Sequence, residues 1–212
     1  SCLGVQAVAL PTVVLSTHTG GLGTPAKLSN PGYGPAALAH YQRLGLRFDC
    51  IYSGYLADPT QAKLVEQAFE LWPRALKVVD PVLGDGGRLY KGLGADMVPA
   101  MYNLCSKANL IVPNVTEAAL LLGDPLPGVG SSEQAAEQAA REYAEIFGPE
   151  HFYLELQDHG IPEQRTVNAQ IRKLAEKLDL PLVVTNDAHY LRKTDAKMQD
   201  VLLCIQTGKT VD

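Results

Sequence analysis

Short apolar runs alternate with helical segments through the first 126 residues of the chain. Four of these runs are rich in apolar and β-branched residues and end at turn residues, which predicts strands at residues 5–15, 48–53, 76–82 and 109–112. Helices are predicted between the later strands and after the last one, over residues 60–72 and up to residue 122. Such short alternation indicates a parallel sheet with helices packed against it, an α/β architecture in three layers.

The helix predicted over residues 60–72 has a clear start signal. Asp58 supplies an N-cap and Pro59 a first-turn proline. The apolar positions that recur at helical spacing are Leu64, Ala68, Leu71 and Trp72. The pattern therefore predicts that these residues form the apolar face of the helix.

A stretch rich in Gly, Pro and Ser interrupts the pattern at residues 123–132, which is linker composition. Beyond it a helix is predicted over residues 133–147, with an apolar stripe at Ala136, Ala140, Tyr143 and Phe147. A half-buried strand, a second helix and a short apolar strand are predicted to follow, at residues 152–157, 167–178 and 181–185. We expect a first domain at 1–126, a linker at 127–132 and a second domain at 133–212.

The composition suits a globular protein and narrows the classes of partner. Hydrophobic residues make up 46% and charged residues 19% of the chain. The net charge of −5 provides no basic field for nucleic acid. No apolar run approaches the roughly 20 residues that span a bilayer, and no signal peptide opens the sequence. We therefore expect neither a nucleic-acid nor a membrane partner.

The cysteines lie far apart, without the short pairs typical of zinc or redox sites: Cys2, Cys50, Cys105 and Cys204. Reduced thiols in a cytoplasm are the simplest interpretation. The sequence begins at Ser1 and enters an apolar segment at once, so we expect it to be part of something longer.

Ligands of parallel sheets bind beyond the carboxyl ends of the strands, and the first candidate site lies there. The strand at residues 76–82 delivers Asp80 and Asp85 into a loop with glycines at 84, 86 and 87. Glycines allow close approach to phosphate, and carboxylates can hold Mg²⁺ beside it. The alternative is a tight turn that Asp85 caps.

Asn114 and Glu117 follow the next strand and form a second candidate. An Asn with a Glu three residues later is the pattern of a helix N-cap. A role in organising magnesium or water is the alternative interpretation.

Ser16, Thr17 and His18 follow the first predicted strand and form a third candidate. Their hydroxyls and imidazole suit the orientation of a polar aromatic substrate. The alternative is that His18 is simply a solvated loop residue.

A fourth candidate lies in the second part of the chain. Asp187 and His189 are two residues apart in an extended segment, so both can face a metal, and His159 follows the preceding strand. A His/Asp/His set suits Zn²⁺, Mn²⁺ or Fe²⁺. A turn or a hydrogen-bonded pair is the alternative.

Taken in order, motifs of the first part resemble the pyridoxal (pyridoxamine) kinases of the ribokinase-like superfamily. The motifs are GVQAVALPT (4–12), LSTHTG (15–20), SGYL (53–56), DPVLGD (80–85) and Pro113-Asn114 with Glu117. The resemblance implies ATP- and Mg²⁺-dependent transfer of the γ-phosphoryl group to the 5′-hydroxyl of a B6 vitamer.

The same resemblance implies roles for the candidate residues. Ser16, Thr17 and His18 would lie near the pyridine pocket. The Mg²⁺–ATP shell would be formed by Asp80, Asp85, Asn114 and Glu117.

Family members also carry a first strand with its helix, and a late glycine-rich loop with a catalytic aspartate and an anion hole. This sequence departs from the family pattern near Asp124, and neither feature is found in it. Phosphoryl transfer depends on positioning and electrostatic stabilisation. We therefore expect kinase activity to be impaired, and the catalytic residue stays unknown.

Motifs of the second part resemble the polymerase-and-histidinol-phosphatase (PHP) domain of bacterial DNA polymerase III α subunits. They are FG (147–148), HFYLELQDHG (151–160), LP (180–181), TNDAHY (185–190) and VLLCIQTGKT (201–210). The resemblance implies a βα piece of a barrel, with His159, Asp187 and His189 as ligands of Zn²⁺ or Mn²⁺ and Glu155 as a neighbour.

Three interpretations stay open at this stage. The chain is a kinase of B6 vitamers with impaired activity, a metal-binding piece of a replication protein, or a non-catalytic α/β chimera that was engineered or arose from a gene-assembly join. The first predicts a small-molecule partner, and all three leave sheet edges through which copies of the chain can associate.

Overall fold

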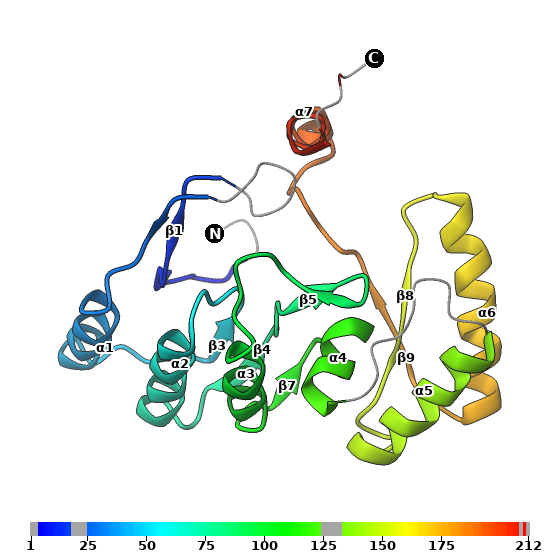
Figure 1. Cartoon of the computed structure of the whole chain (residues 1–212), viewed down its shortest axis with the longest axis horizontal. Coiled ribbons are helices and arrows are strands. Elements are labelled where there is room, and N and C mark those ends of the chain that lie inside the picture. The colour runs from blue at the N-terminus through cyan, green and yellow to red at the C-terminus, as the bar shows by residue number, and fades with distance from the viewer. Residues whose placement is uncertain (1–3, 18–24, 124–132, 208–209, 211–212) are drawn as a thin grey trace. The chain divides into compact units, whose positions relative to one another are not determined.

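A three-stranded parallel sheet organises the first part of the chain in a computed structural model of the protein (Figure 1). Its strands, in spatial order, are β3 (Cys50–Ser53), β4 (Leu76–Val79) and β7 (Leu110–Ile111). The register pairs Ser53 with Val79 and Val79 with Ile111, so the three carboxyl ends meet at one edge of the sheet. The predicted parallel α/β architecture is confirmed.

The structure describes residues 4–17, 25–123, 133–207 and 210. The chain divides into two compact units, Ser1–Val129 and Gly130–Asp212. The predicted linker at 127–132 and the candidate residue His18 lie outside the described residues.

Consecutive helices of the first unit pack against one another in a row (Figure 1). They are α1 (Tyr33–Arg43), α2 (Pro59–Leu71), α3 (Met97–Cys105) and α4 (Val115–Leu122). Helix α2 begins as predicted, because the Asp58 carboxylate accepts a hydrogen bond from Thr60 N at 2.8 Å. Neither α1 nor α3 was predicted from the apolar pattern.

The buried face of α2 shares Ala68 with the predicted one and otherwise differs from it. Its buried apolar residues are Ala62, Val65, Ala68 and Phe69. Helix α2 contacts both β3 and α3, and Ala62, Val65 and Phe69 belong to the core cluster that contains buried residues of α3. Trp72 lies just beyond the helix, where its indole N–H donates to Leu46 O at 2.8 Å and its ring meets Phe48 edge-on.

The strand predicted at residues 5–15 is wrong for most of its length. Only β1 (Val14–Leu15) is a strand, and it pairs antiparallel with β2 (Lys27–Leu28). Pro11 interrupts the segment and has no N–H for a ladder. The strand predicted at 76–82 likewise ends at Val79, before Pro81 and the hairpin of β5 (Gly84–Asp85) and β6 (Arg88–Leu89).

The second unit contains a parallel pair of strands joined through a helix. The pair is β8 (Leu154–Gln157) and β9 (Leu182–Thr185), with α6 (Pro162–Leu178) between them in sequence. The remaining elements are α5 (Glu133–Phe147), η1 (Lys193–Asp195) and α7 (Ala196–Thr207). Parallel pairing with a helical connection is the βα arrangement that the sequence predicts.

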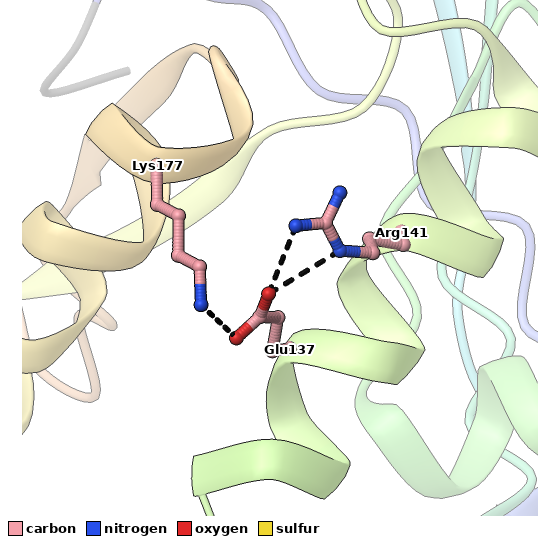
Figure 2. Close-up of polar contacts among 3 residues, drawn as sticks. All are labelled: Glu137, Arg141 and Lys177. Atoms are coloured by element: carbon pink, nitrogen blue, oxygen red, sulfur yellow. Dashed lines mark hydrogen bonds and ion pairs between the residues drawn. The ribbon is translucent and has the colours of Figure 1, made fainter.

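Figure 2 shows Glu137 of α5 between two cations. Lys177 Nζ lies 2.6 Å from Glu137 Oε2, and Arg141 Nη2 lies 2.9 Å from Oε1. Hydrogen bonds from Lys177 and then Arg141 lower the pKa of Glu137. The stabilising effect of these two ion pairs is therefore present above the ordinary carboxyl pKa and is lost as pH falls through the lowered one. It weakens with salt because both cations are exposed. The interaction ties α5 to α6.

Among the described helices, none combines the length and the hydropathy that crossing a membrane requires. The described cysteines Cys50, Cys105 and Cys204 are free thiols.

Truncation of a core residue in α3 tests the packing of the first unit. Leu104 is 0% exposed, so Leu104→Ala is expected to lower the free energy of unfolding by about 2–5 kcal/mol. Leu44, which is 60% exposed, provides the control, and Leu44→Ala is expected to change it by less than about 0.5 kcal/mol. The chain's single tryptophan is Trp72, so urea unfolding followed by its fluorescence reports this unit alone. Equal effects of the two variants would contradict the packing described.

Candidate functional site

Three of the predicted carboxylates lie at or near the carboxyl ends of the strands of the sheet. Asp80 directly follows β4, Asp85 lies in β5 and Glu117 lies in the first turn of α4. Burial raises the pKa of the Tyr90 hydroxyl first, and the charges of Glu117, Asp85 and Asp80 raise it further. Hydrogen bonds between the loop that carries Asp85 and the start of α4 bring these two segments together.

Asn114 and Glu117 form a complete capping box. The Asn114 side chain accepts a hydrogen bond from Glu117 N at 2.9 Å, and Glu117 Oε2 accepts one from Asn114 N at 3.0 Å. The structural role predicted from their spacing is confirmed. The box leaves Glu117 Oε1 and the Asn114 amide N–H groups available for other contacts.

These remaining groups hold the glycine-containing loop that follows β4. Leu83 N donates to Glu117 Oε1 at 3.0 Å, and Asn114 Nδ2 donates to Gly84 O at 2.9 Å. Gly87 N donates to Thr116 Oγ1 at 3.1 Å. The start of α4 thus fixes a loop that lies about thirty residues earlier in the sequence.

Glycine is required at position 84 of this loop. A Cβ added there would lie 2.2 Å from Arg88 O, across the β5–β6 hairpin. Gly86 and Gly87 form the tip, with φ of 57° and 75°, a conformation that other residues rarely adopt. Val82 has a φ of 37°, which is strained for a β-branched residue. Strained backbone of this kind concentrates at functional sites.

Glu117 is a buried carboxylate, only 4% exposed. Burial raises its pKa, backbone hydrogen bonds from Asn114, Leu83 and Gly84 oppose the rise, and the charge of Asp80 adds to it. Desolvation is the largest of these effects, because a charged carboxylate loses its water when it is enclosed.

The two aspartates are used differently. Asp85 is exposed, and its Oδ1 accepts a hydrogen bond from Gly86 N at 2.7 Å, so it caps the turn as the alternative interpretation predicted. Asp80 is half-buried, and its Oδ2 accepts a hydrogen bond from Tyr52 Oη at 2.8 Å. Tyr52 was missed in the sequence, although it comes from the neighbouring strand of the same parallel sheet.

The carboxylates fit a magnesium ion that a nucleotide carries. Among the described residues, no three His, Cys, Asp or Glu side chains are grouped closely enough to hold a metal by themselves. Magnesium is commonly held by one or two protein carboxylates together with phosphate oxygens and water. Asp80 beside a glycine loop matches that donor set. Among the described residues, a site in which protein side chains supply all the ligands is not found.

Two of the predicted substrate residues, Ser16 and Thr17, directly follow β1. Ser16 Oγ accepts a hydrogen bond from Ala26 N at 2.9 Å, and Ser16 N donates to Ala26 O at 3.0 Å. Thr17 is exposed, and His18 lies outside the described residues. In the described part of the chain, Ser16 therefore helps to hold the segment after β1 against the segment before β2. Its role toward a substrate stays a prediction.

A cavity of about 220 Å³ beside β3 was also missed in the sequence. Its lining includes Ser53, Tyr55, Leu10, Phe48 and Trp72. The hydroxyls of Ser53 and Tyr55 are buried and have no hydrogen-bond partner among the described residues, and burial raises the pKa of Tyr55. The signal for this site was the strand-end position of the SGYL motif.

In the second unit, the predicted metal ligand His159 contacts the segment that carries the other two predicted ligands. His159 Nε2 lies 2.8 Å from Asn186 O, and Gln164 Nε2 lies 2.9 Å from His159 Nδ1. This pattern suits a neutral ring that donates from Nε2 and accepts at Nδ1. His159 therefore joins the carboxyl ends of β8 and β9.

Asp187 and His189 lie beside each other at the end of β9. His189 Nδ1 is 2.7 Å from Asp187 O and 3.9 Å from Asp187 Oδ1. Glu155 accepts a hydrogen bond from the Thr185 hydroxyl. Within the described parts of the chain these side chains do not form a group of three that could hold a metal. The metal site at His159, Asp187 and His189 stays a prediction.

No model of a protein family matches this chain. Among solved structures, the chain is similar to a protein of Bacteroides thetaiotaomicron described as a phosphomethylpyrimidine kinase, in a crystal form with pyridoxal. The TM-score is 0.60 and the sequence identity 36%, and the match covers 68% of this chain and 50% of that one. The chain is also similar to pyridoxal kinase from Lactobacillus plantarum, with a TM-score of 0.54 and 43% identity, over 62% of this chain and 47% of that one.

Curated sequences of a different family are also similar to this chain. DNA polymerase III subunit α of Saccharopolyspora erythraea is 48% identical over 77 residues, which are 36% of this chain and 6% of that protein. The Thermus aquaticus subunit is 47% identical over 77 residues, again 36% of this chain and 6% of that protein. The chain thus spans about half of the kinase structures and a small part of the polymerase subunits. The resemblance to two families is confirmed.

The hydrogen bonds from Leu83 N to Glu117, from Gly87 N to Thr116 and from Asn114 to Gly84 O form a clamp between α4 and the loop after β4. Replacement of Glu117 by glutamine tests this clamp. Glu117→Gln turns one acceptor oxygen into an N–H₂ group that faces a backbone donor, and we expect a loss of about 1–3 kcal/mol in the free energy of unfolding at neutral pH. Folding raises the pKa of Glu117 above its ordinary value of 4.5. The resulting contribution to the free energy of unfolding is fully present below pH 4.5 and is lost as pH rises through the raised pKa. The stability advantage of the wild type over the variant should therefore grow as pH falls.

Denaturant unfolding between pH 7 and pH 4 measures this difference. Glu70→Gln, at an exposed position on α2, is the matched control and should change stability by less than about 0.5 kcal/mol at any of these pH values. A difference between wild type and Glu117→Gln that shrinks toward acid pH would contradict the assignment.

Proposed function

We propose that the first unit binds Mg²⁺–ATP at the loop after β4 and phosphorylates the 5′-hydroxyl of a B6 vitamer at a low rate. The observation that carries the proposal is the attachment of this glycine loop to the start of α4 through Asn114 and Glu117. Identities of 36% and 43% with the two kinase-like structures support the same chemistry.

Each predicted residue of the Mg²⁺–ATP shell has a part in this function. The glycine tip of the loop, at Gly86 and Gly87, allows phosphate to approach the backbone. Asp80 and Asp85 supply negative charge for Mg²⁺, and the ion in turn neutralises charge on the phosphates when it is bound. Asn114 and Glu117 keep the loop in place, so the site is organised before the nucleotide arrives.

The low rate follows from the sequence beyond residue 126, which departs from the kinase pattern. It holds no glycine-rich loop whose backbone N–H groups would stabilise the developing negative charge, followed by an aspartate that would activate the hydroxyl. Loss of one such donor typically costs about 10²–10³ in rate. We further propose a cytoplasmic location, where ATP is available and thiols such as Cys50 and Cys105 stay reduced.

Hydrogen exchange with and without Mg²⁺ and a non-hydrolysable ATP analogue tests the binding site. Binding should slow exchange at residues 80–87 and 114–117, and Asp80→Asn should weaken Mg²⁺-dependent binding about tenfold or more. Asp49→Asn is the control, because Asp49 is exposed and precedes β3 at the opposite end of the sheet. Exchange unaffected by nucleotide in the wild type would favour the interpretation of joined, non-catalytic pieces.

A second candidate function is supported by the second unit. We propose that His159, Asp187 and His189 bind one Zn²⁺ or Mn²⁺ after their side chains rotate toward a common point. The supporting observation is that the His159 ring already reaches the backbone of Asn186, next to Asp187. The polymerase subunits' own activity is not part of the proposal, because the chain spans 6% of their length.

Zinc stoichiometry tests this second proposal. The wild type is expected to retain about one Zn²⁺ per chain after gel filtration, and His189→Ala should lose it, because two remaining ligands do not complete a site. His151→Ala changes an exposed histidine of the same unit and should leave the metal content unchanged. Elemental analysis that finds no zinc on the wild type, or the same amount on His189→Ala, would overturn it.

A further inference from the structure

Tyr52 and Asp80 meet across the two neighbouring strands at the candidate nucleotide site. The parallel register pairs Tyr52 with Val78. Side chains alternate along a strand, so Tyr52, Val78 and Asp80 face the same side of the sheet. The Tyr52 hydroxyl donates to Asp80 Oδ2 at 2.8 Å, while Oδ1 has no hydrogen-bond partner among the described residues.

The direction of this hydrogen bond follows from the chemistry of its two groups. The phenolic O–H of Tyr52 donates, and the carboxylate oxygen of Asp80 accepts.

This contact is poorly suited to a role in stability. Tyr52 is 62% exposed, so its ring buries little apolar surface. Asp80 is already placed by the main chain, because its N–H donates to Ser53 O at 2.8 Å. What the hydroxyl adds is the orientation of the carboxylate, which the backbone does not determine.

We infer that Tyr52 is a positioning residue that holds one carboxylate oxygen of Asp80 and leaves the other for the divalent cation of the nucleotide. The inference rests on the proposed Mg²⁺–ATP site and deepens it. A group that orients a metal ligand in this way typically changes metal affinity by about 10–100-fold when it is removed.

The test measures the affinity of Mn²⁺ for the chain with bound adenylyl imidodiphosphate, by electron paramagnetic resonance of the free ion. Tyr52→Phe is expected to weaken Mn²⁺ binding about 10–100-fold while the affinity for the nucleotide without metal stays unchanged. This split distinguishes orientation of the ligand from general damage to the site. Tyr102→Phe, which removes the hydroxyl of a 52% exposed tyrosine on α3, should change neither affinity.

The outcomes separate the inference from the function on which it rests. Mn²⁺ affinity of Tyr52→Phe within twofold of the wild type would overturn the role of Tyr52 and leave the nucleotide site standing. Failure of the wild type itself to bind Mn²⁺ with nucleotide would overturn both. A melting temperature of Tyr52→Phe close to that of the wild type verifies that the variant is folded.

Discussion

The candidate site of the first unit depends on a single buried carboxylate. Glu117 caps its own helix through Asn114 N and holds the loop after β4 through Leu83 N. Enclosing a charge costs free energy, and the backbone N–H groups around Glu117 offset part of that cost. Position at a helix N-terminus, where the peptide dipoles favour negative charge, offsets more. The position of the loop, with Asp80 at its start and Asp85 within it, follows from this arrangement.

Local signals in the sequence predicted much of the fold. Helix α5 occupies the predicted residues 133–147, and α2 begins after the Asp58 cap. These elements are set by caps, prolines and periodicity, which act over a few residues. The segment at 5–13 was different, because forming a strand requires a partner and the pattern of apolar residues does not supply one.

The candidate site was predictable in part for the same reason. Asp80, Asn114 and Glu117 lie at strand ends, and strand ends can be located from the pattern. Tyr52 was not predictable, because its contact with Asp80 follows from the register between two strands. The SGYL motif marks the place of Ser53 and Tyr55 at a strand end, but the burial of their hydroxyls depends on packing by residues far away in the sequence. In the second unit, hydrogen bonds to His159 satisfy groups that the sequence assigns to a metal.

The clamp between α4 and the loop also determines at which positions the residue can change in evolution. On the loop side it engages main-chain groups, Leu83 N, Gly84 O and Gly87 N, so most side chains there can change without breaking it. On the helix side it needs the particular side chains of Asn114, Thr116 and Glu117. Divergent relatives of this unit should therefore keep the first turn of the helix more strictly than the loop that it anchors, with Gly84 as the exception because its hairpin has no room for a Cβ.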